Sequence, residues 1–519
     1  MPQNQRTKQR KKGFALIYVT LIGTFVLIPM GGLAIDFGML YNIKARLQTA
    51  CDAAAIGAGY LLHASTNLSN PAQLATVTTA AQSFFNANYP THYFGSTLSA
   101  YSATVTSSTS GKTITVNATA HVPMLLMRVL GIANSTVAAV AVSNVKFISM
   151  MIVVDRSGSV VVESADATIQ SALTTFVADS TTSYLVDGVD TVGMISFGGT
   201  WKLDYTPNIH FQTASPNIGT AINNIPFRQS GGGSADSSTN TGEGLYQGWT
   251  QLYQMGTPGS GLPGSLNVIV LLTDGRPTAL TSNFTPSSGS SCSSKIARPA
   301  VMDTFVNLGS SYPWWPPPTS GTDTEGLYGS TYQGVPENTY PAANSTNCAY
   351  ASSLTNLYQD LNNTFPASVG PVDRVGSTCG GPCNPSYANA AGAGIPTQSG
   401  YYNAPGQTLQ NPQAGRYAAF NYADNMAKLI RKDTTLAPML FVIGLNYTTQ
   451  LTEPLDADWL ARVANDPNYV TVGSDPNIVA AGQSVYQTGQ TPGMYCNSTP
   501  ATLGACFQQV TSALLRLIQ

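Results

Sequence analysis

Hydrophobic and polar positions follow a helical period early in this chain and a strand-like pattern later. An uncharged apolar stretch covers residues 14–35, and apolar positions three and four residues apart continue beyond it. These positions are Leu40, Ile43, Leu47, Cys51 and Ala54. The spacing predicts one helix that runs on from the apolar stretch to about Leu62.

From Thr97 to about Lys146 the pattern changes to alternation with many β-branched residues, which predicts strands. Residues 124–132, MLLMRVLGI, interrupt the alternation and are expected to form a short helix or a buried loop. We therefore expect a stalk helix at residues 36–66 and a small α+β module at residues 67–146.

Strands and helices alternate from Ile148 onward. The predicted strands are 149–155, 190–197, 265–275 and 438–447, and the predicted helices are 165–179, 241–255, 415–432 and 505–519. Nearly continuous Val, Ile and Leu strands are typical of a parallel sheet with helices on both faces. The pattern predicts an α/β fold with a doubly wound, mostly parallel sheet over residues 147–519.

A segment rich in Gly, Pro, Ser, Asn and Tyr interrupts this alternation at about residues 278–413. Such a composition is unfavourable for regular core elements. We expect an insertion, which is either a surface decoration or a cap beside the sheet whose Trp314 and Trp315 bind a partner.

Composition and the N-terminus indicate an exported, anchored protein. Only 9% of the 519 residues are charged and the net charge is -2, which excludes the basic surface of a nucleic-acid-binding protein. Residues 1–13 carry five basic residues and no acid. The apolar stretch that follows would measure about 33 Å as a helix, which is enough to cross a bilayer.

The expected topology is a single pass through a bacterial inner membrane, with residues 1–13 in the cytoplasm and everything after Asp36 periplasmic or extracellular. Two alternatives remain open. One is a cleaved signal peptide. The other is processing at Gly13-Phe14, which resembles the junction of type IV prepilins, although Tyr18 stands where those pilins usually have Glu.

Six of the seven cysteines lie far beyond the apolar stretch, and an oxidising compartment favours disulfides among them. The candidate pairs are Cys379 with Cys383, Cys496 with Cys506, and Cys292 with Cys348. Cys51 is expected to be a small core or interface residue.

Candidate ligand residues follow two of the apolar strands. The first strand ends in DRSGS, with Asp155, Ser157 and Ser159, and a later one ends in LLTDG, with Asp274. A loop before a helix adds Thr239, with Thr241 as an alternative. Ligands bind at the carboxyl ends of parallel strands, and this set of carboxylates and hydroxyls suits Mg²⁺, Ca²⁺ or Mn²⁺ better than zinc. The alternative for Asp155 is a helix N-cap.

An enzyme is the competing class of function. The four histidines are scattered, none stands beside a candidate nucleophile or in a metal-binding spacing, and DRSGS is not the GxSxG turn of a hydrolase. We therefore expect no catalytic activity.

Residues 148–280 with 414–519 resemble a von Willebrand factor type A domain. The metal-ion-dependent adhesion site of that family uses D-x-S-x-S, a separate Thr and a separate Asp, which match positions here in chain order. The matching positions are Asp155, Ser157, Ser159, Thr239 and Asp274. The resemblance implies a divalent cation whose shell a partner's carboxylate completes.

The first ~65 residues separately resemble TadG-like proteins of the tight-adherence, or Flp, pilus assembly system. The shared features are the basic start, the apolar span, Asp36 two residues before Gly38, and ARLQTACDAAA. Together the two resemblances imply an anchored envelope protein that binds a protein partner, such as a pilin or another assembly component, through a divalent cation. The alternative is a surface adhesin that contacts host or matrix directly.

Overall fold

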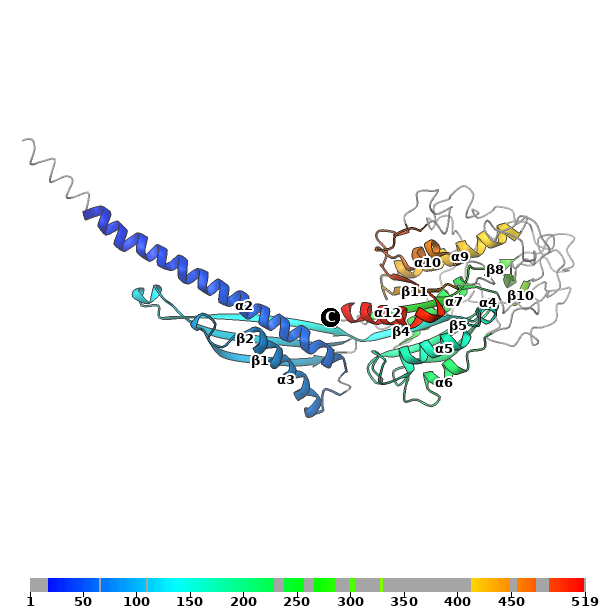
Figure 1. Ribbon diagram of the computed structural model, residues 1–519, viewed down its shortest axis with the longest axis horizontal. Helices are drawn as coiled ribbons and strands as arrows, with labels where there is room; N and C mark the ends of the chain where they lie inside the picture. The colour runs from blue at the N-terminus through cyan, green and yellow to red at the C-terminus, as the bar shows by residue number, and fades with distance from the viewer. Residues whose placement is uncertain are drawn as a thin grey trace, which may run out of the picture. The chain divides into compact units, whose positions relative to one another are not determined.

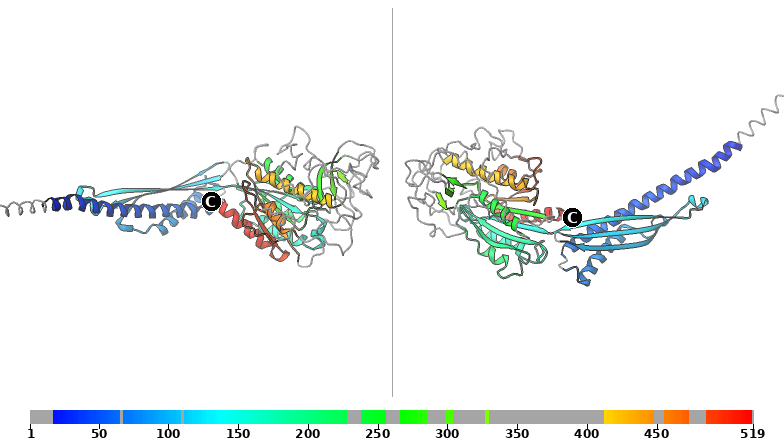
Figure 2. Two further views of the ribbon diagram at one scale, coloured as in Figure 1. Left: turned by 90° about the horizontal axis from the view of Figure 1, so that it is seen from above. Right: turned by 180° about the vertical axis from the view of Figure 1, so that it is seen from behind.

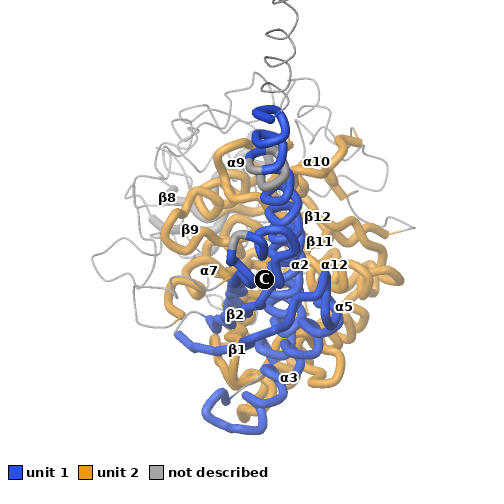
Figure 3. Tube along the Cα trace, turned by 90° about the vertical axis from the view of Figure 1, so that its left-hand side faces the viewer, with its two compact units in different colours: residues 1–146, 519 blue, residues 147–518 orange. Residues whose placement is uncertain are grey.

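A computed structural model describes most of the chain in two compact units, residues 1–146 with 519 and residues 147–518 (Figure 3). The described residues are 17–64, 67–108, 111–227, 238–255, 266–284, 298–303, 327–329, 412–447, 455–472 and 485–517. Each unit has its own sheet and its own core.

The first unit is built on one long helix, α2 (Ile28–Ala64), which is preceded by helical residues from 17 onward that include a π-helical turn at Gly23–Leu27. The helical spacing predicted from the sequence holds, because Ile43, Leu47 and Cys51 are fully buried. Among the described residues no helix combines the length and apolar character that crossing a membrane requires, so the span expected at residues 14–35 stays a prediction.

Helix α2 packs with α3 (Pro71–Asn88) on an antiparallel sheet in the order β1 (Thr97–Ser107), β2 (Gly111–Pro123), β3 (Asn134–Lys146). Alternation along β2 and β3 buries every second residue, as the β-branched pattern predicts. The buried Lys112 ammonium donates to the carbonyls of Leu62 and His63 and so satisfies the last turn of α2.

The second unit is a six-stranded sheet in the order β12-β11-β7-β4-β5-β6. Its strands are β4 (Ile148–Asp155), β5 (Thr191–Phe197), β6 (Trp201–Asn208), β7 (Leu266–Thr273), β11 (Met439–Leu445) and β12 (Met494–Ser498). All pairs are parallel except β5 with β6. The prediction of a mostly parallel α/β sheet is therefore confirmed.

Helices cover both faces of this sheet (Figures 1 and 2). One layer contains α7 (Thr241–Gln254), α9 (Pro412–Lys432) and α10 (Ala457–Ala464), and the other contains α5 (Asp166–Leu173), α6 (Ile218–Asn223) and α12 (Leu503–Leu517). Every residue of β4 and β7 is buried, as their apolar sequences predict. The chain builds outward from β4 in one direction and from β7 in the other, so the order of the sheet reverses between these two strands.

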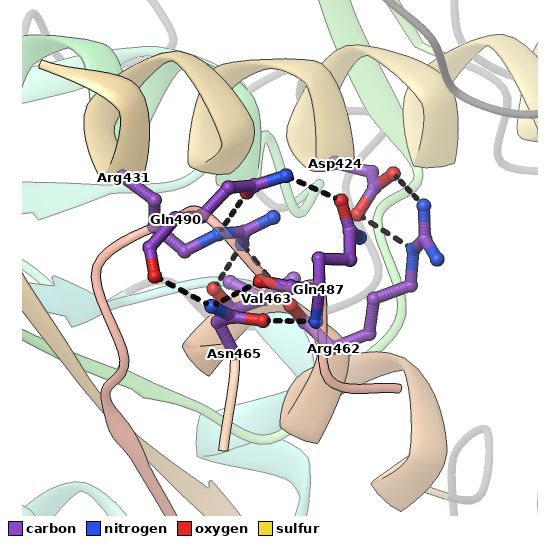
Figure 4. A network of polar contacts seen from close by, with 7 residues as sticks. All are labelled: Asp424, Arg431, Arg462, Val463, Asn465, Gln487 and Gln490. Carbon is purple, nitrogen blue, oxygen red and sulfur yellow. Dashed lines mark hydrogen bonds and ion pairs between the residues drawn. The ribbon is translucent and has the colours of Figure 1, made fainter. Parts of the chain in front are cut away.

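A buried polar network ties α9 and α10 to the segment that leads into β12 (Figure 4). Arg462 donates from Nε and Nη2 to the two oxygens of Asp424, each at 3.0 Å. Arg431 donates to the carbonyls of Arg462 and Val463 and to the side chain of Gln490. These contacts satisfy the last carbonyls of α10 and fix that helix on its face of the sheet.

The insertion expected at about residues 278–413 contains more regular structure than its composition predicted. Strands β8 (Ala279–Phe284), β9 (Arg298–Asp303) and β10 (Leu327–Gly329) form an antiparallel sheet. Backbone pairing is available to any non-proline sequence, so a composition poor in core residues did not prevent it. Trp314, Trp315, Cys292, Cys348, Cys379 and Cys383 lie outside the described residues.

One predicted disulfide is present, between Cys496 in β12 and Cys506 in α12. Cys51 is a buried free thiol, in agreement with the expectation of a small core residue. The disulfide therefore fastens α12 to the edge strand beside it.

Candidate metal centre

Asp155 is the last residue of β4 and is almost fully buried. Its Oδ1 accepts the backbone N–H of Ser157 at 2.9 Å, and its Oδ2 accepts the hydroxyl of Thr273 at 2.6 Å. The first bond turns the chain sharply after the strand, in the manner of an Asx turn. The second links the ends of the two central strands.

The two serines of DRSGS continue this connection. Ser157 Oγ and Ser159 Oγ lie 3.0 Å apart, and Ser159 Oγ donates to Asp274 Oδ1 at 2.9 Å. Ser157 is the N-cap residue of the short helix α4 (Gly158–Val162), but its side chain makes no capping hydrogen bond. Helix capping therefore does not account for the hydroxyls of this motif.

Asp274 follows β7 directly and is also buried. Its second oxygen, Oδ2, accepts the hydroxyl of Tyr447 at 3.2 Å. Tyr447 lies two residues beyond the end of β11, the strand next to β7. Three neighbouring parallel strands thus each end in a residue that contributes to one hydrogen-bonded group.

Thr239 is held at the same edge by its backbone, because its N–H donates to Thr278 Oγ1 and its carbonyl accepts from the N–H of Thr278. A Cβ placed on Gly275 would lie 3.8 Å from Thr239 Oγ1 and 3.9 Å from Ser159 Oγ, so both hydroxyls face the Gly275 backbone. The alternative, Thr241, begins α7, and its buried hydroxyl has no hydrogen-bond partner among the described residues.

Burial dominates the electrostatics of the two carboxylates. It raises the pKa of Asp155, against the hydrogen bonds from Ser157 and Thr273. It raises the pKa of Asp274 still further, with the charge of Asp155 as the second cause. Each of these two buried carboxyl groups makes ionisation of the other less favourable. A bound dication would reduce this repulsion between the two negative charges.

The structure therefore brings all five predicted residues to one edge of the sheet. Two carboxylates and three hydroxyls, without His or Cys, form a hard oxygen donor set that fits Mg²⁺, Ca²⁺ or Mn²⁺. Across the described ranges there is no group of three or more His, Cys, Asp or Glu residues placed to hold a metal ion, so metal binding here would depend on the hydroxyls.

Sequence reasoning missed two members of this group, Thr273 and Tyr447. Both carry a signal that could have found them, since each stands at or just beyond the carboxyl end of an apolar strand that neighbours the site. Asp155 and Asp274 were selected because ligands bind at the carboxyl ends of parallel strands, and the same reason applies to Thr273 and Tyr447.

Comparison with known proteins agrees with both resemblances. Residues 13–66 match the family described as "Putative Flp pilus-assembly TadE/G-like", and residues 149–301 match the von Willebrand factor type A domain. Neither description names a chemical reaction. No curated protein matched the sequence.

Solved structures give only distant likenesses. The PilB minor pilin from Streptococcus sanguinis is 12% identical, with 83% of this chain and 81% of that chain covered and a TM-score of 0.31. The vWF domain of the type V pili tip protein Mfa5 from Porphyromonas gingivalis is 13% identical, with 72% and 97% covered and a TM-score of 0.31. Proximal thread matrix protein 1 from the mussel byssus, described with a zinc-occupied MIDAS motif, is 17% identical, with 25% and 32% covered and a TM-score of 0.18.

The protein combines an N-terminal segment of the TadE/G-like Flp pilus-assembly family with a von Willebrand factor type A domain.

Proposed function

We propose that this protein is a membrane-attached envelope component of a Flp-type pilus assembly system and binds a protein partner through a divalent cation. The cation would be held by Asp155, Ser157, Ser159, Thr239 and Asp274. The observation that carries the proposal is the hydrogen-bonded chain from Thr273 and Asp155 through the two serines to Asp274.

The hydrogen bonds and charges of the five proposed ligand residues support a role for a partner's carboxylate. Both carboxylates of the site already accept two hydrogen bonds each, and the hydroxyls bring no negative charge. A hard dication bound there would keep ligand positions for an additional oxygen. Ser159 is half-buried whereas Asp155, Ser157, Thr239 and Asp274 are buried, so a partner would approach over Ser159.

The attachment to a membrane is supported by the sequence and by the exposure of the helix. The uncharged stretch at residues 14–35 follows a basic segment, and the large apolar side chains between Ile17 and Ile35 that the structure describes are mostly exposed. The exposed surface of this helix is apolar, as a lipid environment requires.

Isothermal titration of the full chain with Mg²⁺ and with Mn²⁺, in the absence and presence of a carboxylate peptide, tests the metal site. The affinity of the Ser157→Ala variant should fall at least about tenfold, since one direct ligand is lost. Ser143→Ala removes a buried serine from β3 in the other unit and serves as the matched control. If the wild-type chain takes up no metal in either condition, the proposed site is wrong.

A surface adhesin would use the same site, so cell fractionation must separate the two functions. Protease added to intact cells should leave the type A domain uncut if the protein acts in assembly within the envelope. Complete digestion of that domain at the cell surface would favour the adhesin.

A further inference from the structure

The connection between β2 and β3 is fixed to the N-terminal half of α2 by one carboxylate. Asp36 Oδ1 accepts the backbone N–H of Leu125 at 3.0 Å, and Oδ2 accepts those of Leu126 at 3.0 Å and Met127 at 2.7 Å. These amides open the turn η3 (Met127–Leu130). They hold the pKa of Asp36 below its ordinary value, with the bond from Met127 as the largest cause.

A second contact lies one helical turn away from Asp36. A Cβ placed on Gly32 would come within 2.8 Å of Leu126 Cβ, so only glycine lets the loop pack this closely on the helix. Gly32 and Asp36 are both buried and are spaced i and i+4, which places them on one side of α2. These contacts hold the loop against that side of the helix, and Figures 1 and 2 show the end of the β2–β3 connection near the N-terminal part of α2.

Four large apolar side chains of this loop, residues 124–133, are exposed, whereas Met124 is buried. Val129 is 86% exposed and Leu125 is 61% exposed, and Leu126 and Ile132 are exposed as well. A short helix or a buried loop was expected here; the turn is present, but these four apolar residues are not buried. The loop has one charged residue, the exposed Arg128, and no acidic residue.

Large apolar side chains are exposed on several sides of the described N-terminal part of the neighbouring helix. Consecutive residues Ile17, Tyr18 and Val19 are exposed, and so are Met30, Leu33, Ile35 and Phe37 further along. A protein groove accepts a helix along one apolar stripe, whereas exposed apolar residues on all sides suit surrounding lipid. Arg128 is a fitting neighbour for lipid phosphate, because an Arg side chain can lay its stem along apolar surface while its charged head reaches the phosphate.

From these contacts we propose that the 124–133 loop is a second membrane contact, which enters the outer interface of the same bilayer as the N-terminal helix. Asp36 acts as the clamp that holds the loop at the depth of this outer interface. Because Asp36 accepts three amide N–H groups, no unpaired carboxylate faces the lipid. The occupant of the surface is an anionic phospholipid bilayer. The proposal rests on the membrane attachment in the proposed function but not on the metal site.

Labelling of single cysteines in the full chain tests it. The variants Val129→Cys and Leu125→Cys place thiols on the loop, and Ser107→Cys places one on an exposed position that pairs with Lys112 at the opposite end of β2. Each chain is reconstituted in vesicles of phosphatidylcholine and phosphatidylglycerol, floated, and treated with a membrane-impermeant maleimide. Peptide mass spectrometry then reports each position separately from the native cysteines.

Relative to its rate in the denatured chain, each loop cysteine should react at least tenfold more slowly than the cysteine at position 107. Equal rates in a chain that floats would overturn the loop contact and leave the helix attachment intact. A chain that does not float after reconstitution would overturn both. Protection that disappears when the chain is diluted with excess lipid would assign the surface to a second copy of the chain instead.

Discussion

The hydroxyl of Tyr447 donates to Oδ2 of Asp274 across 173 positions of sequence, at a distance of 3.2 Å. Burial raises the pKa of this phenol far above its ordinary value, so Tyr447 stays a donor throughout the physiological pH range. The bond gives the end of β11 a direct part in positioning a carboxylate that follows β7.

Replacing Tyr447 by Phe should therefore leave one oxygen of a buried carboxylate without its partner. We expect a loss of about 1–3 kcal/mol in the free energy of unfolding, together with weaker Mg²⁺ binding, measured by urea denaturation and titration calorimetry. Tyr205→Phe is the control, because its buried hydroxyl donates to the carbonyl of Phe211 instead of to a site residue. Equal Mg²⁺ affinities for wild type and Tyr447→Phe would argue against this positioning role.

The raised pKa of Asp274 leads to a prediction on pH. A carboxyl group with a higher pKa in the folded state than in the unfolded state favours folding below the unfolded value of about 3.9, and this contribution is lost as pH rises through the folded value. Without metal, the domain should therefore lose stability from about pH 4 upward over the range set by the raised pKa. Saturating Mg²⁺ should reduce this loss, because the cation compensates the two charges.

The Asp274→Asn variant tests two effects of this carboxylate, the pH-dependent cost of its buried charge and its binding of Mg²⁺. In EDTA the variant should lose less stability than the wild type as pH rises, since it has no charge to bury at this position. Mg²⁺ should raise the melting temperature of the wild type and not that of the variant. Asp187→Asn is the control, because Asp187 accepts the N–H of Gln212 near the amino end of β5. A variant that Mg²⁺ still stabilises would contradict a metal role for Asp274.

The disulfide between Cys496 and Cys506 closes a short loop, because the two residues are only ten positions apart in sequence. Changing both cysteines to Ser should cost about 2–3 kcal/mol of stability through the greater freedom of the unfolded chain. Thermal melts with and without reductant measure the effect, and reductant should shift the wild type more than the double variant. Equal shifts would show that the stabilising bond lies elsewhere in the chain.

Burial and the nearby charge of Asp52 raise the pKa of the Cys51 thiol to about 11. Iodoacetamide attacks the thiolate, so alkylation of Cys51 in the folded protein at about pH 8 should be slow and should accelerate strongly in urea. Peptide mass spectrometry can follow this one residue. Fast labelling under native conditions would mean that α2 does not pack on the sheet of the first unit as described.

Sequence reasoning found the parallel sheet because β4 and β7 are continuous apolar runs. Such runs are typical of strands in a parallel sheet that helices cover on both faces. It selected Asp155 and Asp274 because these runs end abruptly in carboxylates. Metal binding by these residues stays a prediction. The strand before Tyr447 was recognised, but Tyr447 itself was missed because a phenol just beyond the end of a strand does not by itself indicate a ligand site.

Other features could not be predicted from local patterns. The pairing of β8, β9 and β10 depends on backbone hydrogen bonds, which the composition of the insertion does not reveal. The role of Asp36 depends on three amides that lie 89, 90 and 91 positions away, beyond the reach of any periodicity. The sequence marked Asp36 as the first acidic residue after the apolar stretch and as a feature shared with TadG-like proteins, but not as the acceptor of these amides.

That separation along the chain sets an order of events during synthesis. Asp36 leaves the ribosome well before the residues that supply its amides, so the growing chain first presents a carboxylate with no partner at the end of its apolar segment. The carboxylate is satisfied only when β2 and the turn after it have also been made. Nascent chains that end before Leu125 lack all three amide partners of Asp36. We expect α2 to be held less firmly to the rest of the first unit in these chains than in longer ones, because the 124–133 loop is made late.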